Sequence, residues 1–203
     1  MSQHRNQSLD SIHLLKTVVS DIADSLVDID KSRERAPKAK GGFYQAGVGP
    51  FPEWLLLNRI CQILGSKTEY QGKVETRRCP DLLIRGSWAL EFRIARPFGD
   101  NGKDAEDWSV NLLHPYIGNT SSLGDCMKLL KLNMPERKAV VVIGYEHDPT
   151  QKSLAPLLDS FEILAEKIMK IKLGPRITEN RKNLIHPVHQ QVTVYGWEVC
   201  GSI

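Results

Sequence analysis

The sequence predicts an α/β protein with a mixed central sheet, and three observations on the 203-residue chain support this prediction. A continuous apolar and mostly β-branched run at residues 139–145 is typical of a strand buried on both faces, as in parallel or mixed sheets covered by helices. Apolar residues at helical spacing within 51–65 and 153–172 predict helices before and after that strand. Two short apolar runs that meet at Gly86 and Ser87 predict a hairpin.

The composition is that of an ordinary globular protein. Hydrophobic residues make up 41% and charged residues 25% of the chain, and no apolar run approaches the ~20 residues that span a bilayer, so we expect no membrane partner. Residues 1–6 are polar and lack the apolar segment of a signal peptide, and we therefore expect a cytoplasmic protein with reduced cysteines. The net charge of +3 is too small to indicate nucleic-acid binding unless the basic residues gather on one face.

An N-terminal helix is predicted at residues 9–30, where apolar side chains recur mainly at spacings of three and four. The seam consists of Leu9, Ile12, Leu15, Val19, Ile22, Leu26 and Ile29. It is too short to decide between a helix that packs on its own chain and a coiled coil that forms a homodimer. Basic residues and two glycines follow within 31–42, either as a solvated tether or as an arm that contacts DNA. We divide the chain into an N-terminal helix with its basic linker at 1–42 and a main domain at 43–203.

The main domain begins with the helix at 51–65, whose first turn contains Glu53. Polar, partly alternating residues at 67–78 then predict an exposed or edge strand that carries Lys73. Beyond the hairpin, the expected elements are a long loop at 97–121, a helix that begins with a cap at 121–125 and runs to about 132, the buried strand at 139–145, a helix at 153–172 and a closing strand at 192–199. The sequence therefore alternates helices and strands throughout.

The stretch at 79–95 carries charges inside apolar runs. Leu90, Phe92 and Ile94 alternate with two charged residues, so period-two geometry places the apolar side chains on one face of the strand and the charged side chains on the other. The charged residues are Glu91 and Arg93.

Asp81 opens the first strand of the hairpin, and the turn at Gly86 is expected to bring its carboxylate near that of Glu91. Together the two acids are suited to hold a divalent cation. The alternative interpretation takes Asp81 as a turn acid, and Glu91 with Arg93 as an exposed ion pair on an edge strand. A second candidate metal motif, His186 with His189, is better explained by a surface or packing role, because the proline between the two residues excludes a helix and no third ligand is nearby.

The pattern of Pro80 and Asp81 followed by Glu91, Phe92 and Arg93 resembles that of the PD-(D/E)XK superfamily, in which an acid follows proline and an acid-x-lysine motif lies on the next strand. The resemblance covers roughly 51–145. It implies the restriction-endonuclease-like fold, with an αβββαβ core and a mixed central sheet. An N-terminal helix and an extra C-terminal αβ unit would complete the chain.

The resemblance implies that Asp81 and Glu91 bind Mg²⁺ or Mn²⁺, with Glu53 as an additional acid and metal ligand. Such cations prefer carboxylate oxygens and water as ligands. A bound cation lowers the pKa of its water and neutralises charge that develops on a phosphate. Arg93 stands where the superfamily has lysine, and a guanidinium clamps a phosphate but does not deprotonate water.

Three outcomes remain open for this position: Arg93 binds the phosphate, Lys128 or Lys73 takes the place of the lysine, or the site binds without cleaving. The expected function is that of a metal-dependent nuclease that acts on DNA, with RNA as the second candidate, in restriction, defence or repair. Lys73, Arg96 and Lys128 are the candidate nucleic-acid-binding residues. The alternative is a catalytically worn-down module that binds nucleic acid or serves as an assembly subunit of a larger complex.

Overall fold

The computed structural model describes residues 14–106, 108–114 and 121–202. Its elements are α2 (Leu15–Lys31), α3 (Glu53–Ser66), β1 (Val74–Thr76), β2 (Leu82–Ile84), β3 (Trp88–Ala95), α4 (Val110–Leu113), α5 (Ser122–Lys131), β4 (Arg137–Glu146), α6 (Ala155–Ile163), the π-helical turn η1 (Leu164–Ile168), β5 (Ile171–Leu173), β6 (Ile177–Arg181) and β7 (Gln191–Ser202). In this part of the chain, every helix is too short or too polar to cross a membrane.

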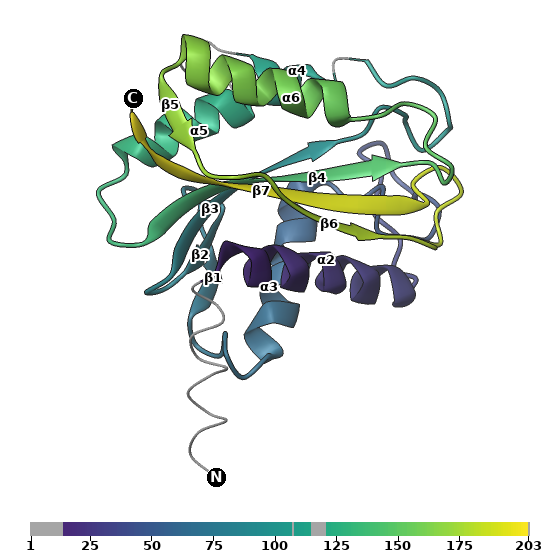
Figure 1. Ribbon diagram of the computed structural model, residues 1–203. Helices are drawn as coiled ribbons and strands as arrows, with labels where there is room; N and C mark the ends of the chain where they lie inside the picture. The colour runs from purple at the N-terminus through teal and green to yellow at the C-terminus, as the bar shows by residue number, and fades with distance from the viewer. Residues whose placement is uncertain (1–13, 107, 115–120, 203) are drawn as a thin grey trace.

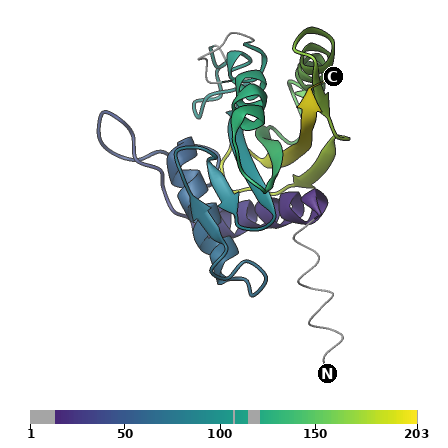
Figure 2. The same cartoon turned by 90° about the vertical axis from the view of Figure 1, so that its left-hand side faces the viewer.

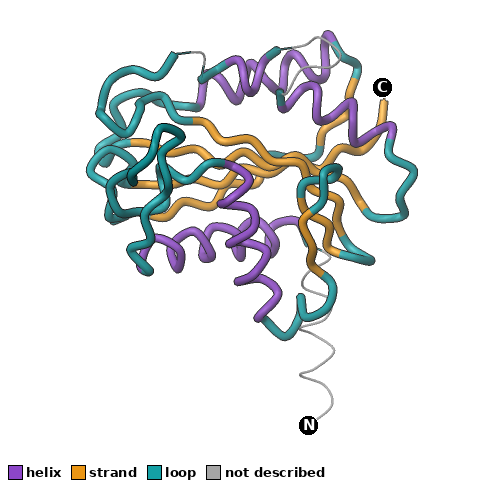
Figure 3. The backbone as a smooth tube through the Cα atoms, turned by 180° about the vertical axis from the view of Figure 1, so that it is seen from behind, coloured by secondary structure: helices purple, strands orange, loops and turns teal. Residues whose placement is uncertain are grey.

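Seven strands form one mixed sheet, in the order β1-β2-β3-β4-β7-β5, and β6 also pairs with β7. The β3–β4 pair is parallel and the other pairs are antiparallel. The helices α2 and α3 cover one face of the sheet and α4, α5 and α6 cover the other (Figure 1). Figures 2 and 3 show the same layers from the side and from behind. The predicted α/β class with a mixed sheet is therefore confirmed.

The two faces of the sheet bury separate apolar clusters. On β4, Val141 and Ile143 belong to the cluster under α2 and α3, whereas Val140 and Val142 belong to the cluster under α5 and α6. This alternation explains why the run at 139–145 is apolar without interruption, as expected for a strand with helices on both sides.

The apolar seam of α2 packs within its own chain. Val19, Ile22 and Leu26 are fully buried and belong to the same cluster as residues of α3, β3 and β4. The intramolecular alternative is thus confirmed for the described part of the seam, whereas the homodimer through the 9–30 helix stays a prediction. Leu9 and Ile12 lie outside the described residues. The division at 42 and 43 stays a prediction, although α2 and α3 share one core.

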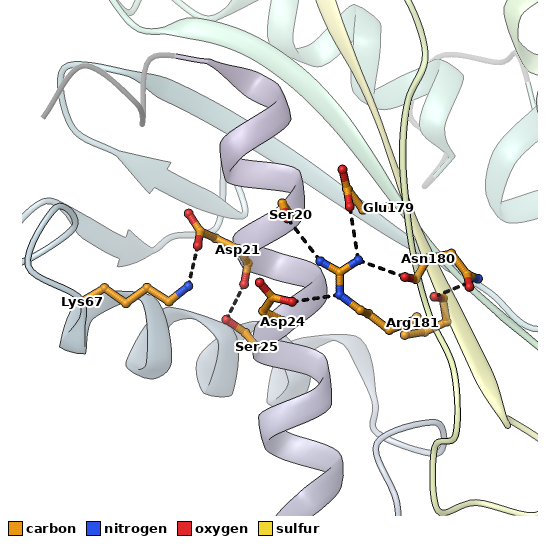
Figure 4. A network of polar contacts seen from close by, with 9 residues as sticks. Ser20, Asp21, Asp24, Ser25, Lys67, Glu179, Asn180 and Arg181 are labelled. Carbon is orange, nitrogen blue, oxygen red and sulfur yellow. Dashed lines mark hydrogen bonds and ion pairs between the residues drawn. The ribbon is translucent and has the colours of Figure 1, made fainter. Parts of the chain in front are cut away.

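Polar contacts hold α2 at its exposed side (Figure 4). The guanidinium of Arg181 on β6 donates to Asp24 at 2.8 Å and to Ser20 at 3.2 Å. Lys67 approaches Asp21 to 2.5 Å from the end of α3. Under the helix, a Cβ atom at Gly196 would lie 2.7 Å from the Val19 side chain, so glycine permits the close approach of α2 to β7.

The hairpin and the helix cap are formed as predicted. Strands β2 and β3 pair in antiparallel register about Gly86, which has a φ of 72° that favours glycine. The Ser121 hydroxyl accepts a hydrogen bond from the backbone N–H of Gly124 at 3.1 Å and caps α5.

The predicted helix at 153–172 is wrong at its C-terminal end. The Met169 N–H bonds to the Leu164 carbonyl, which widens the last turn to a π-helical turn, and Lys170 reverses the chain with a φ of 56°. Residues 171–173 then pair with β7 as an additional strand. Apolar spacing alone does not distinguish a helix that continues from one that gives way to a short strand.

Replacement of Ile22 by alanine should lower the free energy of unfolding by about 2–5 kcal/mol, because it leaves a cavity between α2 and the sheet. Chemical unfolding monitored by circular dichroism measures this loss. The matched control is Leu14→Ala, whose side chain is 62% exposed and whose removal should cost less than about 0.5 kcal/mol. A midpoint that rises with protein concentration would instead indicate that the α2 seam forms a dimer.

Candidate active site

The hairpin brings the first two predicted acids together. Leu82 pairs with Leu90, and continuing this antiparallel register by one residue places Asp81 opposite Glu91. Residues opposite each other in such a pair project to the same face of the sheet. The backbone N–H of Phe92 donates to Asp81 Oδ2 at 2.9 Å and fixes one oxygen of this carboxylate beside Glu91.

Glu91 is a buried acid on a central strand. Its side chain has 0% exposure, and the Nζ atom of Lys128 on α5 lies 2.6 Å from its Oε2. Its Oε1 atom has no hydrogen-bond partner within the residues that the structure describes. Because β3 lies between β2 and β4, and because Glu91 pairs with Lys128 rather than Arg93, the interpretation as an exposed ion pair on an edge strand is wrong.

The electrostatics of Glu91 are those of crowded carboxylates. Burial raises the pKa of Glu91, the charge on Asp81 raises it further, and Lys128 opposes both effects. Two hard oxygen donors that repel each other, with one buried oxygen unpartnered, are suited to a divalent cation. The donor set of Asp81 and Glu91 therefore fits the predicted Mg²⁺ or Mn²⁺.

Arg93 is held by two acids, which come from helices that cover opposite faces of the sheet. Its Nε and Nη2 atoms lie 2.8 and 2.9 Å from the two oxygens of Asp125 on α5, which is bidentate geometry. Its Nη1 atom lies 3.0 Å from Glu53 Oε1 on α3. With a side chain only 12% exposed, Arg93 joins these acids instead of facing a phosphate.

Asp125 is a site residue that the sequence interpretation missed. It lies three residues before Lys128 on α5, and its Oδ1 is also 3.2 Å from Nζ of that lysine. The sequence places Asp125 in the first turn of a capped helix, which accounts for an acid there without reference to a site. The available signal in the sequence is the spacing of three residues between Asp125 and Lys128, which places both side chains on the same side of a helix.

Glu53 reaches the site from the first turn of α3, as predicted. The pKa of Glu53 is raised to about 7, chiefly by burial and also by the charges on Asp81 and Asp125, while Arg93 acts in the lowering direction. Glu53 and Asp81 line an open pocket of about 400 Å³. In the described ranges, no three acid, histidine or cysteine side chains are arranged to hold one ion, so Glu53 stays a predicted ligand that is paired with Arg93 here.

The predicted nucleic-acid-binding residues lie in three different places. Lys128 belongs to the site. The Lys73 carbonyl accepts from Arg85 at 2.9 Å, at the hairpin end of β1 and β2, whereas the Asp81 carbonyl accepts from Arg77 at the other end. The structure therefore does not bring Lys73 to the acids.

Arg96 lies beyond the C-terminal end of β3. Its guanidinium donates to the Phe51 carbonyl and is 5.4 Å from the centre of the Tyr145 ring, and burial lowers its pKa. It lines a second cavity, of about 280 Å³, with Trp108 and with other residues of the predicted 97–121 loop. The described part of that loop thus covers this cavity.

The two histidines have a packing role, as predicted. The rings of His186 and His189 are buried and stacked, with centres 4.7 Å apart. The His186 Nδ1 atom accepts from the backbone N–H groups of Val188 and His189, both at 3.2 Å. Gly47 and Gly49 leave the space that these side chains fill.

Two carboxylates on adjacent strands, a lysine facing them and an arginine that bridges two further acids form one compact charged site. A comparison of the chain with protein-family models, curated proteins and solved structures found no match.

Replacement of Arg93 by alanine should lower the free energy of unfolding by about 3 kcal/mol, because it removes the main partner of Asp125, whose side chain is 3% exposed. The double variant Arg93→Ala, Asp125→Ala should lose less than the sum of the two single variants. Chemical unfolding of all four proteins measures the coupling. The matched control is Arg77→Ala, an exposed partner of Glu75, which should cost less than about 1 kcal/mol; additive losses would contradict the assigned contact.

The raised pKa of Glu53 predicts a pH-dependent stability in the absence of divalent cations. Between pH 4.5 and 7 the folded protein binds more protons at Glu53 than the unfolded protein does, so this contribution is present below pH 4.5 and is lost as the pH rises through 7. Thermal unfolding from pH 4.5 to 8 should show the wild-type protein losing stability relative to Glu53→Gln. A constant difference between the two proteins would contradict the assigned pKa.

Proposed function

We propose that this protein is a metal-dependent nuclease that hydrolyses phosphodiester bonds in DNA, in restriction, defence or repair. One observation carries the proposal: Asp81, directly before β2, stands opposite Glu91 on β3, and Lys128 Nζ lies 2.6 Å from Glu91. The order α3, β1, β2, β3, α5, β4, with β3 parallel to β4, supports a restriction-endonuclease-like αβββαβ core of the PD-(D/E)XK superfamily.

Asp81 and Glu91 would hold a Mg²⁺ or Mn²⁺ ion, with Glu53 as the candidate third acid. When bound, the ion would supply an acidified water and neutralise charge on the phosphate. The chain itself contributes the positions of the acids: the Phe92 N–H orients Asp81, and the central strand keeps Glu91 away from bulk water. Burial also strengthens every electrostatic interaction of Glu91.

Lys128 takes the place that the resemblance gives to lysine on β3. Burial lowers its pKa, but the hydrogen bond to Glu91 and the charge on Asp125 raise it by more, so Lys128 is protonated at neutral pH. A protonated lysine acts as a hydrogen-bond donor that stabilises charge developing on a phosphate, rather than as a base. Arg93 is then a positioning residue, which acts through Glu53 and Asp125.

The second candidate is a worn-down module that binds nucleic acid without cleaving it. The ion pairs of the site favour this alternative, since Arg93 and Lys128 already partner Glu53, Asp125 and Glu91. A site whose acids are neutralised by the chain has less need of a cation. The two candidates differ in one property, the hydrolysis of a phosphodiester bond.

Wild-type protein should nick supercoiled plasmid DNA with Mg²⁺ or Mn²⁺, and Asp81→Asn and Glu91→Gln should abolish nicking. Lys128→Ala should lower the rate by about 10²–10³-fold, the cost of one donor aimed at developing charge. Lys128→Arg keeps the charge and should lose less. Gel-based rates at fixed protein and metal concentrations measure these effects.

Thermal unfolding provides a control that does not depend on cleavage. Mg²⁺ at pH 8 should raise the unfolding temperature of the wild-type protein and should not raise that of Asp81→Asn, because a ligand stabilises only the state that binds it. If the wild-type protein cleaves neither DNA nor RNA with either metal, the nuclease proposal fails and the binding module takes its place.

A further inference from the structure

A tryptophan is exposed beside the acids. The Trp54 side chain is 62% exposed, whereas Trp88 and Trp197 are fully buried. Single exposed apolar residues are common and need no special explanation. Trp54 differs in its position, because it follows Glu53 in the first turn of α3 and lines the same pocket as Asp81.

The pocket combines this indole with cationic and polar side chains. Its further lining residues are Leu57, Asn58, Thr76, Arg77 and Arg78. Asn58 and Thr76 are hydrogen-bonded to each other at 3.2 Å and join α3 to the end of β1. The acids and the two arginines therefore line the same pocket.

The two arginines lie on the segment between β1 and Asp81. Arg77 pairs with Glu75, and Arg78 is exposed and forms no ion pair within the described ranges of the chain. Guanidinium groups bind phosphate oxygens through paired N–H donors. Acids, arginines and an exposed indole thus line one pocket, and these groups suit the phosphates and the base of a nucleotide chain.

We propose that this pocket binds an unpaired nucleotide next to the bond to be cleaved, with its base stacked on Trp54 and its phosphates held by Arg77 and Arg78. This inference rests on the proposed function and names its substrate class, single-stranded or splayed polynucleotide. Stacking on an aromatic side chain requires a base with a free face, and bases inside a duplex are covered on both faces. A blunt duplex therefore lacks the feature that the pocket recognises.

Binding measured without divalent cations tests the inference separately from catalysis. Fluorescence anisotropy with a labelled DNA strand of about 12 nucleotides and with the blunt duplex of the same sequence should show tighter binding of the single strand. Trp54→Ala should weaken single-strand binding about tenfold, and Trp54→Phe should retain most of it. The single strand should also quench tryptophan fluorescence in the wild-type protein and less in Trp54→Phe.

The contribution of the arginines can be recognised in the salt dependence of binding. Arg78→Ala should weaken binding and reduce the slope of the logarithm of the binding constant against the logarithm of salt concentration by about 1, because one phosphate contact is lost. The matched control is Ile163→Ala, a 59% exposed apolar residue on α6 at the other face of the sheet, which should bind like the wild-type protein. An RNA strand of the same sequence, bound as tightly and with the same dependence on Trp54, would support recognition of any unpaired nucleotide.

Three results would overturn the inference: equal or tighter binding of the duplex, unchanged binding by Trp54→Ala, or loss of binding by Ile163→Ala equal to that of Trp54→Ala. These results are distinct from failure of the proposed function. Single-strand binding through Trp54 without cleavage would contradict only the proposed nuclease activity. Cleavage that Trp54→Ala leaves unchanged would contradict only the proposed stacking site.

Discussion

A carboxylate without exposed surface in the middle of a central strand is the constraint on which the rest of this structure depends. A buried charge is tolerated only with a partner, and Glu91 has Lys128 as its partner from α5. Asp81 stands beside it and increases the repulsion that must be compensated. The position of α5 on the sheet brings Lys128 Nζ within 2.6 Å of Glu91 Oε2. Both the fold and the site therefore require this position of the helix.

The same network joins helices from both layers. Glu53 comes from α3 and Asp125 from α5, two helices that cover opposite faces, and Arg93 contacts both acids. This arrangement explains why an arginine, with its forked donors, suits β3 better than a lysine would. The lysine that faces the acids, Lys128, lies on α5.

The hairpin and its acids could be predicted from the sequence, because period-two alternation and the turn at Gly86 fix which residues meet. The partners of Arg93 and Lys128 could not, since they depend on how α5 lies on the sheet. The seam of α2 allowed both a coiled coil and an intramolecular helix, because the same apolar spacing suits either. Short strands such as β5 and β6 depend on pairing with β7, which local sequence does not encode.

The position of Arg93 between the two helical layers has a consequence for how the chain tolerates change over generations. A residue needed only for catalysis can be replaced freely once the activity is no longer needed. A residue whose loss lowers the fraction of folded protein is retained even then, because its replacement lowers the amount of protein in the cell. Arg93 belongs to the second kind, whereas Lys128, with a side chain 40% exposed, belongs closer to the first. Among diverged relatives, retention of lysine at position 128 would therefore report a working site better than retention of the arginine at 93.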